Sequence, residues 1–247
     1  DIQDIPEGLR HLKNLQLLDL SQNCLYRTPD FIVELKNLSA LYLNDAALAS
    51  LPVAFGTLTS LINLELRDNL LKALPDSFGQ LLRLERLDLG GNEIDELSPV
   101  IGRLESLEEL WLDSNSLSRL PPEIGKLMRL KCLDVSENQL EVLPNELCQL
   151  RTLSDLLLSQ NALKKLPKDI GKLRKLTILK VDQNQLSHIP DSLGQCESLQ
   201  ELILTENELT QVPPDLGNLS RLTNLNIDRN HVQRLPPDIG MLSALSI

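Results

Sequence analysis

Three aspartates, Asp88, Asp113 and Asp134, are the best candidates for chemistry in this sequence of 247 residues. We predict that they lie on adjacent parallel strands, which pair about 4.8 Å apart. Carboxylates at that spacing can perform acid–base chemistry or bind Ca²⁺. A parallel array brings any repeated residue into the same relation, however, so a plain acidic surface is the preferred interpretation.

Histidines and cysteines add no second chemical site. His11, His188 and His231 are far apart, and the sequence has no HExxH, GxSxG or GxxxxGK[ST] motif. The four cysteines, at 24, 132, 148 and 196, form no CxxC pair and fit reduced thiols of the cytosol. We therefore expect no enzymatic activity, no cofactor and no metal ion.

Composition narrows the choice of partners. The net charge is −11 and the sequence pI is about 4.8, which argues against nucleic acid and anionic lipid, because both need clustered Lys and Arg. The sequence contains no run of 18 apolar residues, so no membrane span is predicted. The first residues, "DIQDIPEGLRHL", lack the basic start and apolar run of a signal peptide. A basic protein partner fits this surface best.

An internal repeat organises the elements that must position these residues. Asparagine recurs every 23 residues in the pattern LxxLxLxxNxL, followed by xxLPxxIGxLxx, at 23, 69, 92, 115, 138, 161, 184, 207 and 230. The pattern is typical of a leucine-rich repeat solenoid. We predict an α/β horseshoe, with a parallel β-sheet on the concave face and short helical or 3-10 segments on the convex face.

Each repeat position has a physical role. The central xLx of LxxLxL is a short strand whose Leu points inward and whose neighbours face the concave side. The ladder Asn hydrogen-bonds backbone groups of neighbouring coils. Leu-Pro, as in Leu74-Pro75, starts the convex segment, and Ile-Gly, as in Ile101-Gly102, packs inward and lets the chain turn. Ser98, before Pro99, departs from Leu-Pro and is expected to shift one convex turn.

We predict one domain, residues 1–247, with about ten ladder positions. Its free energy of unfolding should be close to the sum of the interaction energies between adjacent repeats. The chain starts in "DIQDIPEGL", which matches the tail of a preceding repeat. It ends in Leu245-Ser246-Ile247, which matches the start of another strand. We expect an internal fragment of a longer array, truncated at both ends.

Ala46 stands in the one gap of the asparagine ladder, although Leu43 and Leu48 keep the register around it. Asn44 lies two residues too early to replace the missing amide. If backbone groups go unpaired there, the cost is about 1–3 kcal/mol. Ala46→Asn is therefore expected to stabilise the chain.

The concave face is predicted to be acidic and to carry the partner site. The fifth, seventh and eighth positions of the repeats contain eleven acids but three bases, Arg67, Lys180 and Arg229. Trp111, the single Trp, lies among Asp88, Asp113 and Asp134 and resembles a binding hot spot. Gly90 and Gly91 are expected to leave room beside it. The predicted partner-binding residues are Tyr42, Glu65, Arg67, Asp88, Trp111, Asp113, Asp134, Glu137 and Leu157.

A series of runs carries a closer resemblance. "LYLNDAALASLP", "LELRDNLLKALP", "RLDLGGNEIDEL", "ELWLDSNSL", "LDVSENQLEVLPNE", "LLLSQNAL", "ILKVDQNQL", "QELILTENEL" and "LNIDRN" occur in order. The series resembles the N-terminal solenoid of the LAP family of polarity proteins over essentially the whole chain. "DQNQL" followed by "CESLQELILTENEL" is most similar to the Scribble and Lano branch.

The resemblance implies a cytoplasmic scaffold at the basolateral plasma membrane and cell junctions. Such scaffolds act in apical–basal polarity, adhesion, growth control and, in neurons, at synapses. Lethal-giant-larvae-like proteins are the implied partners. Peripheral membrane association would run through partners, or through lipidation outside this chain. PDZ domains follow the solenoid in this family, but no PDZ signature occurs here.

Two other classes of function stay open at this point. One is the regulatory leucine-rich repeat domain of a signalling enzyme, such as a phosphatase, or of a Ras-pathway adaptor. The other is a secreted or receptor ectodomain, which would be expected to carry cysteine-rich caps. Sequence on either side of the chain would separate the three, because PDZ domains support the scaffold and a catalytic domain supports the enzyme.

Overall fold

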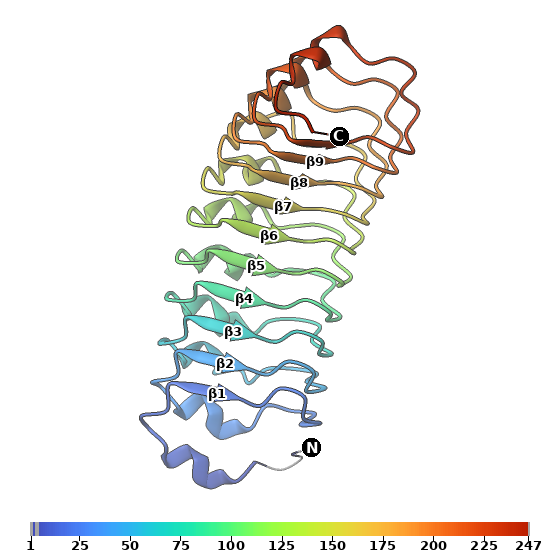
Figure 1. Ribbon diagram of the computed structural model, residues 1–247. Coiled ribbons are helices and arrows are strands. Elements are labelled where there is room, and N and C mark those ends of the chain that lie inside the picture. The colour runs from blue at the N-terminus through green and yellow to red at the C-terminus, as the bar shows by residue number, and fades with distance from the viewer. Residues whose placement is uncertain (1, 3–4, 247) are drawn as a thin grey trace.

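The computed structural model describes Ile2 and residues 5–246. The chain forms one stack of coils that rises from the N-terminus at the bottom of Figure 1 to the C-terminus at the top. Ten parallel strands form a single open sheet in chain order. They are β1 (Leu17–Asp19), β2 (Ala40–Tyr42), β3 (Asn63–Glu65), β4 (Arg86–Asp88), β5 (Glu109–Trp111), β6 (Cys132–Asp134), β7 (Asp155–Leu157), β8 (Ile178–Lys180), β9 (Glu201–Ile203) and β10 (Asn224–Asn226). Each strand is the predicted xLx triplet, so the fold class is confirmed.

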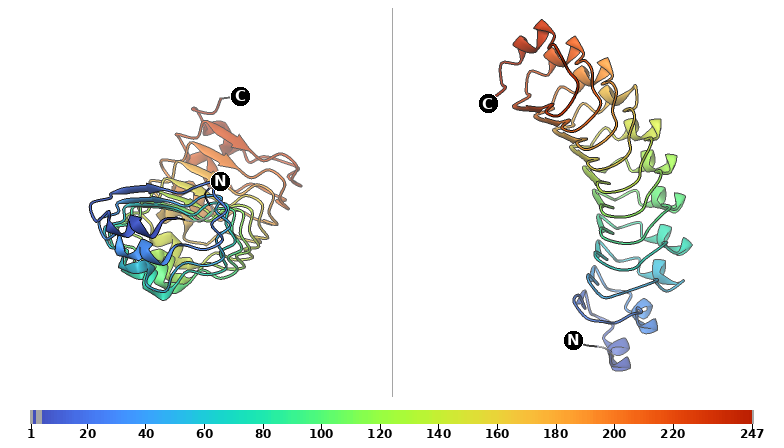
Figure 2. Two further views of the ribbon diagram at one scale, coloured as in Figure 1. Left: turned by 90° about the horizontal axis from the view of Figure 1, so that it is seen from below. Right: turned by 90° about the vertical axis from the view of Figure 1, so that its right-hand side faces the viewer.

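Short 3-10 helices cover the opposite side of the coils. They are η1 (Glu7–His11), η2 (Asp30–Glu34), η3 (Phe55–Thr57), η4 (Asp76–Gln80), η5 (Pro99–Arg103), η6 (Pro122–Lys126), η7 (Asn145–Gln149), η8 (Ile170–Lys172), η9 (Asp191–Gln195), η10 (Pro214–Asn218) and η11 (Pro237–Met241). They follow the outer edge of the curve (Figure 2, right). Among the described residues, none of these helices is long and apolar enough to cross a membrane.

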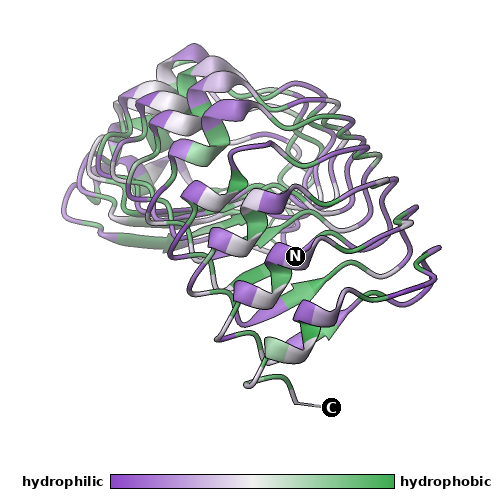
Figure 3. Ribbon diagram, turned by 90° about the horizontal axis from the view of Figure 1, so that it is seen from above, coloured by the Kyte–Doolittle hydropathy of each residue, from purple (hydrophilic) through white to green (hydrophobic). Residues whose placement is uncertain are grey.

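The core is a column of leucines that repeats from coil to coil. Leu64, Leu87 and Leu110 pair in register at the centres of β3, β4 and β5, and none of them is exposed to solvent. Hydrophobic positions recur at the same place around successive coils (Figure 3). The flanking strand residues are only partly buried and form the concave surface. This alternation delivers polar side chains to the concave face at every coil.

The asparagine ladder works as predicted. The Nδ2 group of Asn92 donates to the carbonyls of Leu66 and Leu89, both at 2.9 Å, and to Gly90 at 3.2 Å. Its Oδ1 accepts from the amide of Leu71 at 3.1 Å. One side chain therefore satisfies buried backbone groups of its own coil and of the preceding coil, which would otherwise be costly.

The gap at Ala46 does not leave the expected groups unpaired. By the ladder spacing, an Asn at this place would accept from the amide of Leu25, but that amide already donates to the carbonyl of Asn23 at 2.8 Å. The backbone of this turn is also different. Ala47 has φ = 54°, and no equivalent residue in the other described coils has positive φ. The amide of Ala46 donates to Oδ1 of Asn69 at 3.1 Å. The expected cost of unpaired backbone groups at the gap is therefore wrong.

In most coils, a glycine on the convex side precedes a five-residue helix in the next coil. A Cβ added to Gly125 would lie 2.5 Å from the carbonyl oxygen of Glu146, so glycine lets the next coil approach closely. From η3 onward, helices that follow this glycine have five residues, whereas η3 and η8 have three. These two follow Val33 and Cys148, which replace the glycine. In the first coil, where Arg10 holds the place, the next helix still has five residues.

Two further sequence expectations have clear outcomes. Ser98 does not shift the convex turn: it takes the N-cap place of η5, and its Oγ accepts from the amide of Val100 at 3.4 Å. The helix keeps five residues because Pro99 occupies its first position, where no amide proton is needed.

The predicted truncation concerns the two ends of the chain. Leu245 is 37% exposed, while Asp1 and Ile247 lie outside the described residues. The domain boundaries stay a prediction.

Candidate functional site: the concave surface around Trp111

Trp111 ends β5 and lies half-buried on the concave surface. In the sheet it pairs with Asp88 of β4 on one side and with Asp134 of β6 on the other. The parallel ladder thus places an indole ring between two carboxylates in a row across three strands. We call the surface from β3 to β7 around this ring the Trp111 surface.

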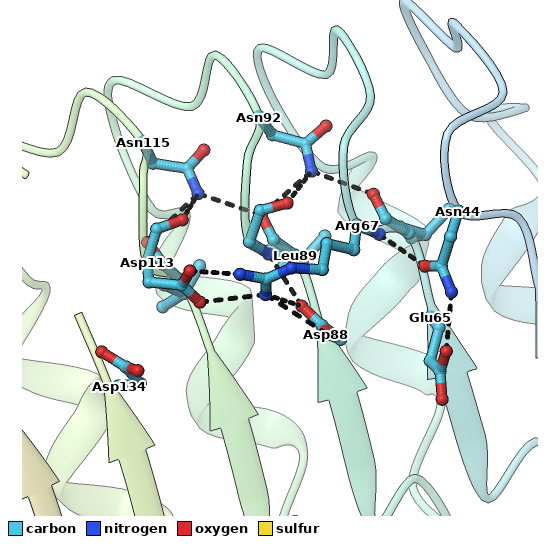
Figure 4. A network of polar contacts seen from close by, with 12 residues as sticks. Asn44, Glu65, Arg67, Asp88, Leu89, Asn92, Asp113, Asn115 and Asp134 are labelled. Atoms are coloured by element: carbon cyan, nitrogen blue, oxygen red, sulfur yellow. Dashed lines mark hydrogen bonds and ion pairs between the residues drawn. The ribbon is translucent and has the colours of Figure 1, made fainter. Parts of the chain in front are cut away.

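Arg67, just after β3, organises the carboxylates on one side of the Trp111 surface (Figure 4). Its Nη1 lies 3.1 Å from Oδ1 of Asp88 and 3.1 Å from Oδ1 of Asp113. Its Nη2 donates to Oδ2 of Asp113. The hydrogen bond that the guanidinium donates to Asp113 raises the pKa of Arg67. Two of the three candidate aspartates are therefore held by one cation.

Gly90 makes this bridge possible, which corrects the expectation that it leaves room for a partner. Arg67, Gly90 and Asp113 hold the same repeat position in three consecutive coils. A Cβ on Gly90 would lie 2.1 Å from Nη1 of Arg67 and 2.7 Å from Oδ1 of Asp113. At Gly91, which has φ = 63°, a Cβ would lie 2.2 Å from Oδ1 of Asp68. The space over both glycines is filled by side chains of this chain.

A second set of bonds fixes the backbone from which Arg67 departs. Asn44 accepts from the amide of Arg67 at 2.8 Å through Oδ1 and donates from Nδ2 to Glu65 at 2.7 Å. Its own amide donates to Oγ of Ser21 at 3.1 Å. Glu65 and Arg67, both predicted as partner-binding, thus lie in one network that spans the first five coils (Figure 4).

Arg86 and Glu109 are functional candidates that lie outside the fifth, seventh and eighth repeat positions and are not among the predicted partner-binding residues. The guanidinium carbon of Arg86 lies 5.6 Å from the centroid of the Trp111 ring, within the range of a cation–π contact. Nη2 of Arg86 also lies 2.6 Å from Oε2 of Glu109. Both residues hold the third repeat position, so this row of the sequence would have revealed them.

On the other side of Trp111, the acids lack such neutralisation. Oδ1 of Asp134 accepts from the amide of Ser136 at 2.9 Å, and no basic side chain of residues 5–246 forms an ion pair with Asp134. Asp155 of β7 pairs in register with Cys132 and accepts from Oγ of Ser154 at 2.7 Å. The Trp111 surface therefore ends in two carboxylates without a cation.

Burial raises the pKa of two of these carboxyl groups. For Asp88 and for Asp134 the first cause is loss of solvent, which disfavours the ionised form. Bonds from backbone amides and the charge of Arg67 act in the opposite direction at both sites. The pKa of Cys132 rises to about 12, because the partly buried thiol loses solvent and lies near Asp155, Asp134 and Glu109. Cys132 thus faces the concave side as an inert thiol rather than a nucleophile.

The remaining predicted residues lie on the same face but are spread along it. Tyr42 of β2 is half-buried, and Glu65 and Asp88 separate it from Trp111 along the row. Glu137 is exposed and accepts from Oγ of Ser114 at 3.0 Å. Leu157 is half-buried and pairs in register with Asp134. Asp134, Trp111 and Leu157 therefore cluster, whereas Tyr42 does not join them.

The three bases of the fifth, seventh and eighth repeat positions are all engaged by acids of the chain. Arg67 holds two aspartates, Nζ of Lys180 lies 3.3 Å from Oε1 of Glu201, and Arg229 pairs with Glu206. Eight of the eleven acids form no ion pair within the described residues: Asp19, Asp45, Glu65, Asp68, Asp134, Glu137, Asp182 and Asp228. In the part of the chain that the structure describes, no cluster of three or more His, Cys, Asp or Glu side chains is arranged to hold a metal ion. The surface is thus suited to binding cations carried by a partner.

Comparison with known proteins identifies the class. Family models described as leucine-rich repeat match residues 49–94 and 106–127, and a model of a leucine-rich repeat region matches residues 122–234. The chain contains a leucine-rich repeat domain and is a protein-interaction module of that kind. A comparison with curated protein sequences finds no match.

Solved structures give the same answer for the fold. A leucine-rich repeat protein of Leptospira interrogans is 29% identical, with a TM-score of 0.68 over 99% of this chain and 86% of the other. The plant peptide hormone receptor RGFR1, in complex with RGF2, is 31% identical, with a TM-score of 0.74 over 98% and 44%. The ectodomain of the Arabidopsis thaliana receptor kinase GASSHO1/SCHENGEN3, in complex with CASPARIAN STRIP INTEGRITY FACTOR 2, is 30% identical, with a TM-score of 0.80 over 98% and 33%. This chain spans less than half of either plant protein.

Proposed function

We propose that this chain is the protein-binding solenoid of a LAP-type polarity scaffold and that its Trp111 surface holds a basic segment of a partner. The observation that supports this most directly is the pairing of a half-buried Trp111 with Asp134, a carboxylate without a cation. A partner Lys or Arg would supply the missing charge, and its aliphatic stem would pack on the indole ring.

The energetics favour a cationic partner group at this place. Partial burial raises the pKa of Asp134, and a partner cation beside it would stabilise the ionised carboxylate. Trp111 contributes apolar area near the centre of the face, which is where binding energy concentrates in protein interfaces. Leu157 and Ile178, both half-buried on neighbouring strands, extend the apolar contact.

The proposed membership of the LAP family is supported by the ordered series of sequence runs that resemble that family. Under this proposal the chain acts in the cytoplasm at the basolateral membrane and cell junctions, and Lethal-giant-larvae-like proteins are its partners. The two plant receptors carry peptide or protein ligands on the same kind of solenoid, which supports partner binding in general.

Two measurements test the proposal at different levels. Binding of a purified Lethal-giant-larvae-like protein should weaken steeply as salt rises from 50 to 500 mM, because exposed charge pairs are screened. Salt-insensitive binding would argue against the acidic surface. The sequence of the complete transcript tests the family: PDZ domains after the solenoid support the scaffold, whereas a catalytic domain overturns it.

A further inference from the structure

A groove on the flank that leads into the convex helices is separate from the Trp111 surface. It spans three coils and has a volume of ≈ 360 Å³. Leu143 and Leu166 form its buried floor, and Val142, which is 49% exposed, forms one wall. Lys165, Lys168 and His188 line its rim. We call this the Lys165 groove.

The Lys165 groove lies where the convex glycine register is interrupted. Cys148 takes the place of the glycine in the coil before η8, and η8 starts only at Ile170. Asp169 takes φ = −97° and ψ = 16° before η8, whereas the residues before the five-residue helices from η4 to η11 are extended. Lys168 therefore leaves the chain on a turn beside the groove rather than within a helix.

The charge of the Lys165 groove is opposite to that of the chain. Lys165 and Lys168 are exposed, and neither forms an ion pair within residues 5–246. Residues 126–180 contain eleven Lys and Arg against six Asp and Glu, although the whole chain has a net charge of −11. This is the one long stretch of the solenoid where basic residues clearly outnumber acids.

An equivalent groove two coils earlier serves as an internal reference. It is lined by Glu96, Arg119 and Glu123 and has a volume of ≈ 210 Å³. Its cation is neutralised, since Nη2 of Arg119 lies 2.8 Å from Oε1 of Glu96. It follows the glycine register without interruption, because Gly102 precedes η6. The Lys165 groove thus differs from the reference groove both in volume and in positive charge that no acid of the chain pairs within residues 5–246.

We propose that the Lys165 groove docks an acidic linear segment of a partner protein. An apolar side chain of the segment sits over Leu143 and Leu166, and carboxylates on either side pair with Lys165 and Lys168. An extended strand advances about 3.3 Å per residue, so about three residues cross the two coil steps of about 4.8 Å. The sequence class that fits is an acidic residue, a large aliphatic residue and a second acidic residue. Partners of opposite charge would then occupy the two faces of the solenoid.

The test is fluorescence anisotropy with a panel of labelled hexapeptides that carry one Leu or Ile between Asp and Glu residues. The 247-residue chain should bind panel peptides, and Lys165→Glu combined with Lys168→Glu should weaken binding at least about tenfold. Cys148→Gly should also weaken binding, because it narrows the groove without changing its charge. Arg119→Glu, in the reference groove, should leave binding unchanged.

Each contrary result has a definite meaning. Absence of binding by every panel peptide overturns the proposal, as does equal binding by the wild type and the double lysine variant. Replacing the peptide Leu by Ala tests whether the apolar side chain contributes to binding in addition to the charges. Unchanged affinity would contradict docking of that side chain in the Lys165 groove. A third outcome is that no peptide binds but the wild type binds vesicles of phosphatidylserine and phosphatidylcholine. If the double lysine variant loses vesicle binding, the groove is a lipid site and the proposal is overturned. Melting curves verify that each variant is folded.

Discussion

Arg67 extends across Gly90 and donates two hydrogen bonds to the carboxylate of Asp113, 46 residues further along the chain. The bridge joins the third coil to the fifth, although repeats of this kind otherwise interact mainly with their immediate neighbours. It couples three coils beside Trp111 and holds the local charges in place. The charges on this side of the Trp111 surface are thus held by contacts within the chain itself.

Gly90→Ala should break this bridge. The new Cβ would lie 2.1 Å from Nη1 of Arg67, so the guanidinium must leave Asp113 or the coils must separate. We expect a loss of about 1–3 kcal/mol in the free energy of unfolding, measured by urea denaturation.

Gly240→Ala is the matched control, because a Cβ there meets no atom within 4 Å. It should change stability by less than about 1 kcal/mol. In an Arg67→Ala background, Gly90→Ala should cost much less, since the clashing guanidinium is gone. Additive effects of the two substitutions would show that Gly90 is needed for another reason.

Asn92→Ala tests the ladder. It leaves the buried amide of Leu71 without an acceptor, whereas the carbonyl of Leu66 keeps Nδ2 of Asn69 as a donor at 2.9 Å. Because a buried unpaired group costs about 1–3 kcal/mol, the free energy of unfolding should fall by that amount. Asn224→Ala, at an exposed strand position, should be nearly neutral. Equal effects of the two substitutions would contradict the role of the ladder amide.

Ala46→Asn should not stabilise the chain, contrary to the expectation from the repeat pattern. Ala46 is fully buried, and the amide of Leu25 that the new side chain would serve already has a partner. Added volume in a packed site typically costs about 1–3 kcal/mol. Thermal melting should therefore show a lower Tm, and a higher Tm would restore the original expectation.

Periodicity made most of the fold predictable. The 23-residue spacing sets which Leu is buried, which Asn forms the ladder and which triplet pairs as a strand, because these depend on local position alone. The acidic concave face and the place of Trp111 on it follow from the same register. The same register places Cys148 at the convex glycine position.

Other features depend on side-chain reach or on small volume changes. The sequence places Arg67 and Asp113 on one row, but that one guanidinium spans two coils follows from its rotamer and from the missing Cβ of Gly90. Shortening of η8 by Cys148 requires the spacing between adjacent convex backbones. The altered turn at Ala46 likewise involves a positive φ at Ala47, which alternation of hydrophobic residues does not encode.

Trp111→Ala should weaken binding of a basic partner segment by about 2 kcal/mol or more, roughly 30-fold, if the ring anchors the partner. Trp111→Phe, which keeps an apolar ring, should lose less. Isothermal titration calorimetry measures both affinities, and circular dichroism verifies the fold. Unchanged affinity of a folded Trp111→Ala chain would remove the ring from the site.

The affinity of Asp134→Asn for a Lys- and Arg-rich segment of the Lethal-giant-larvae-like partner tests the central claim most directly. Asp19→Asn is the matched control, because Asp19 holds the same repeat position and also accepts from the amide two residues later, at 3.0 Å. Titration calorimetry should show about tenfold weaker binding for Asp134→Asn and little change for Asp19→Asn. Lowering the pH protonates Asp134 before an ordinary aspartate, whose pKa is about 3.9, so wild-type affinity should fall from a higher pH than in Asp134→Asn. Equal affinities of the wild type and Asp134→Asn would contradict binding of a basic segment at the Trp111 surface.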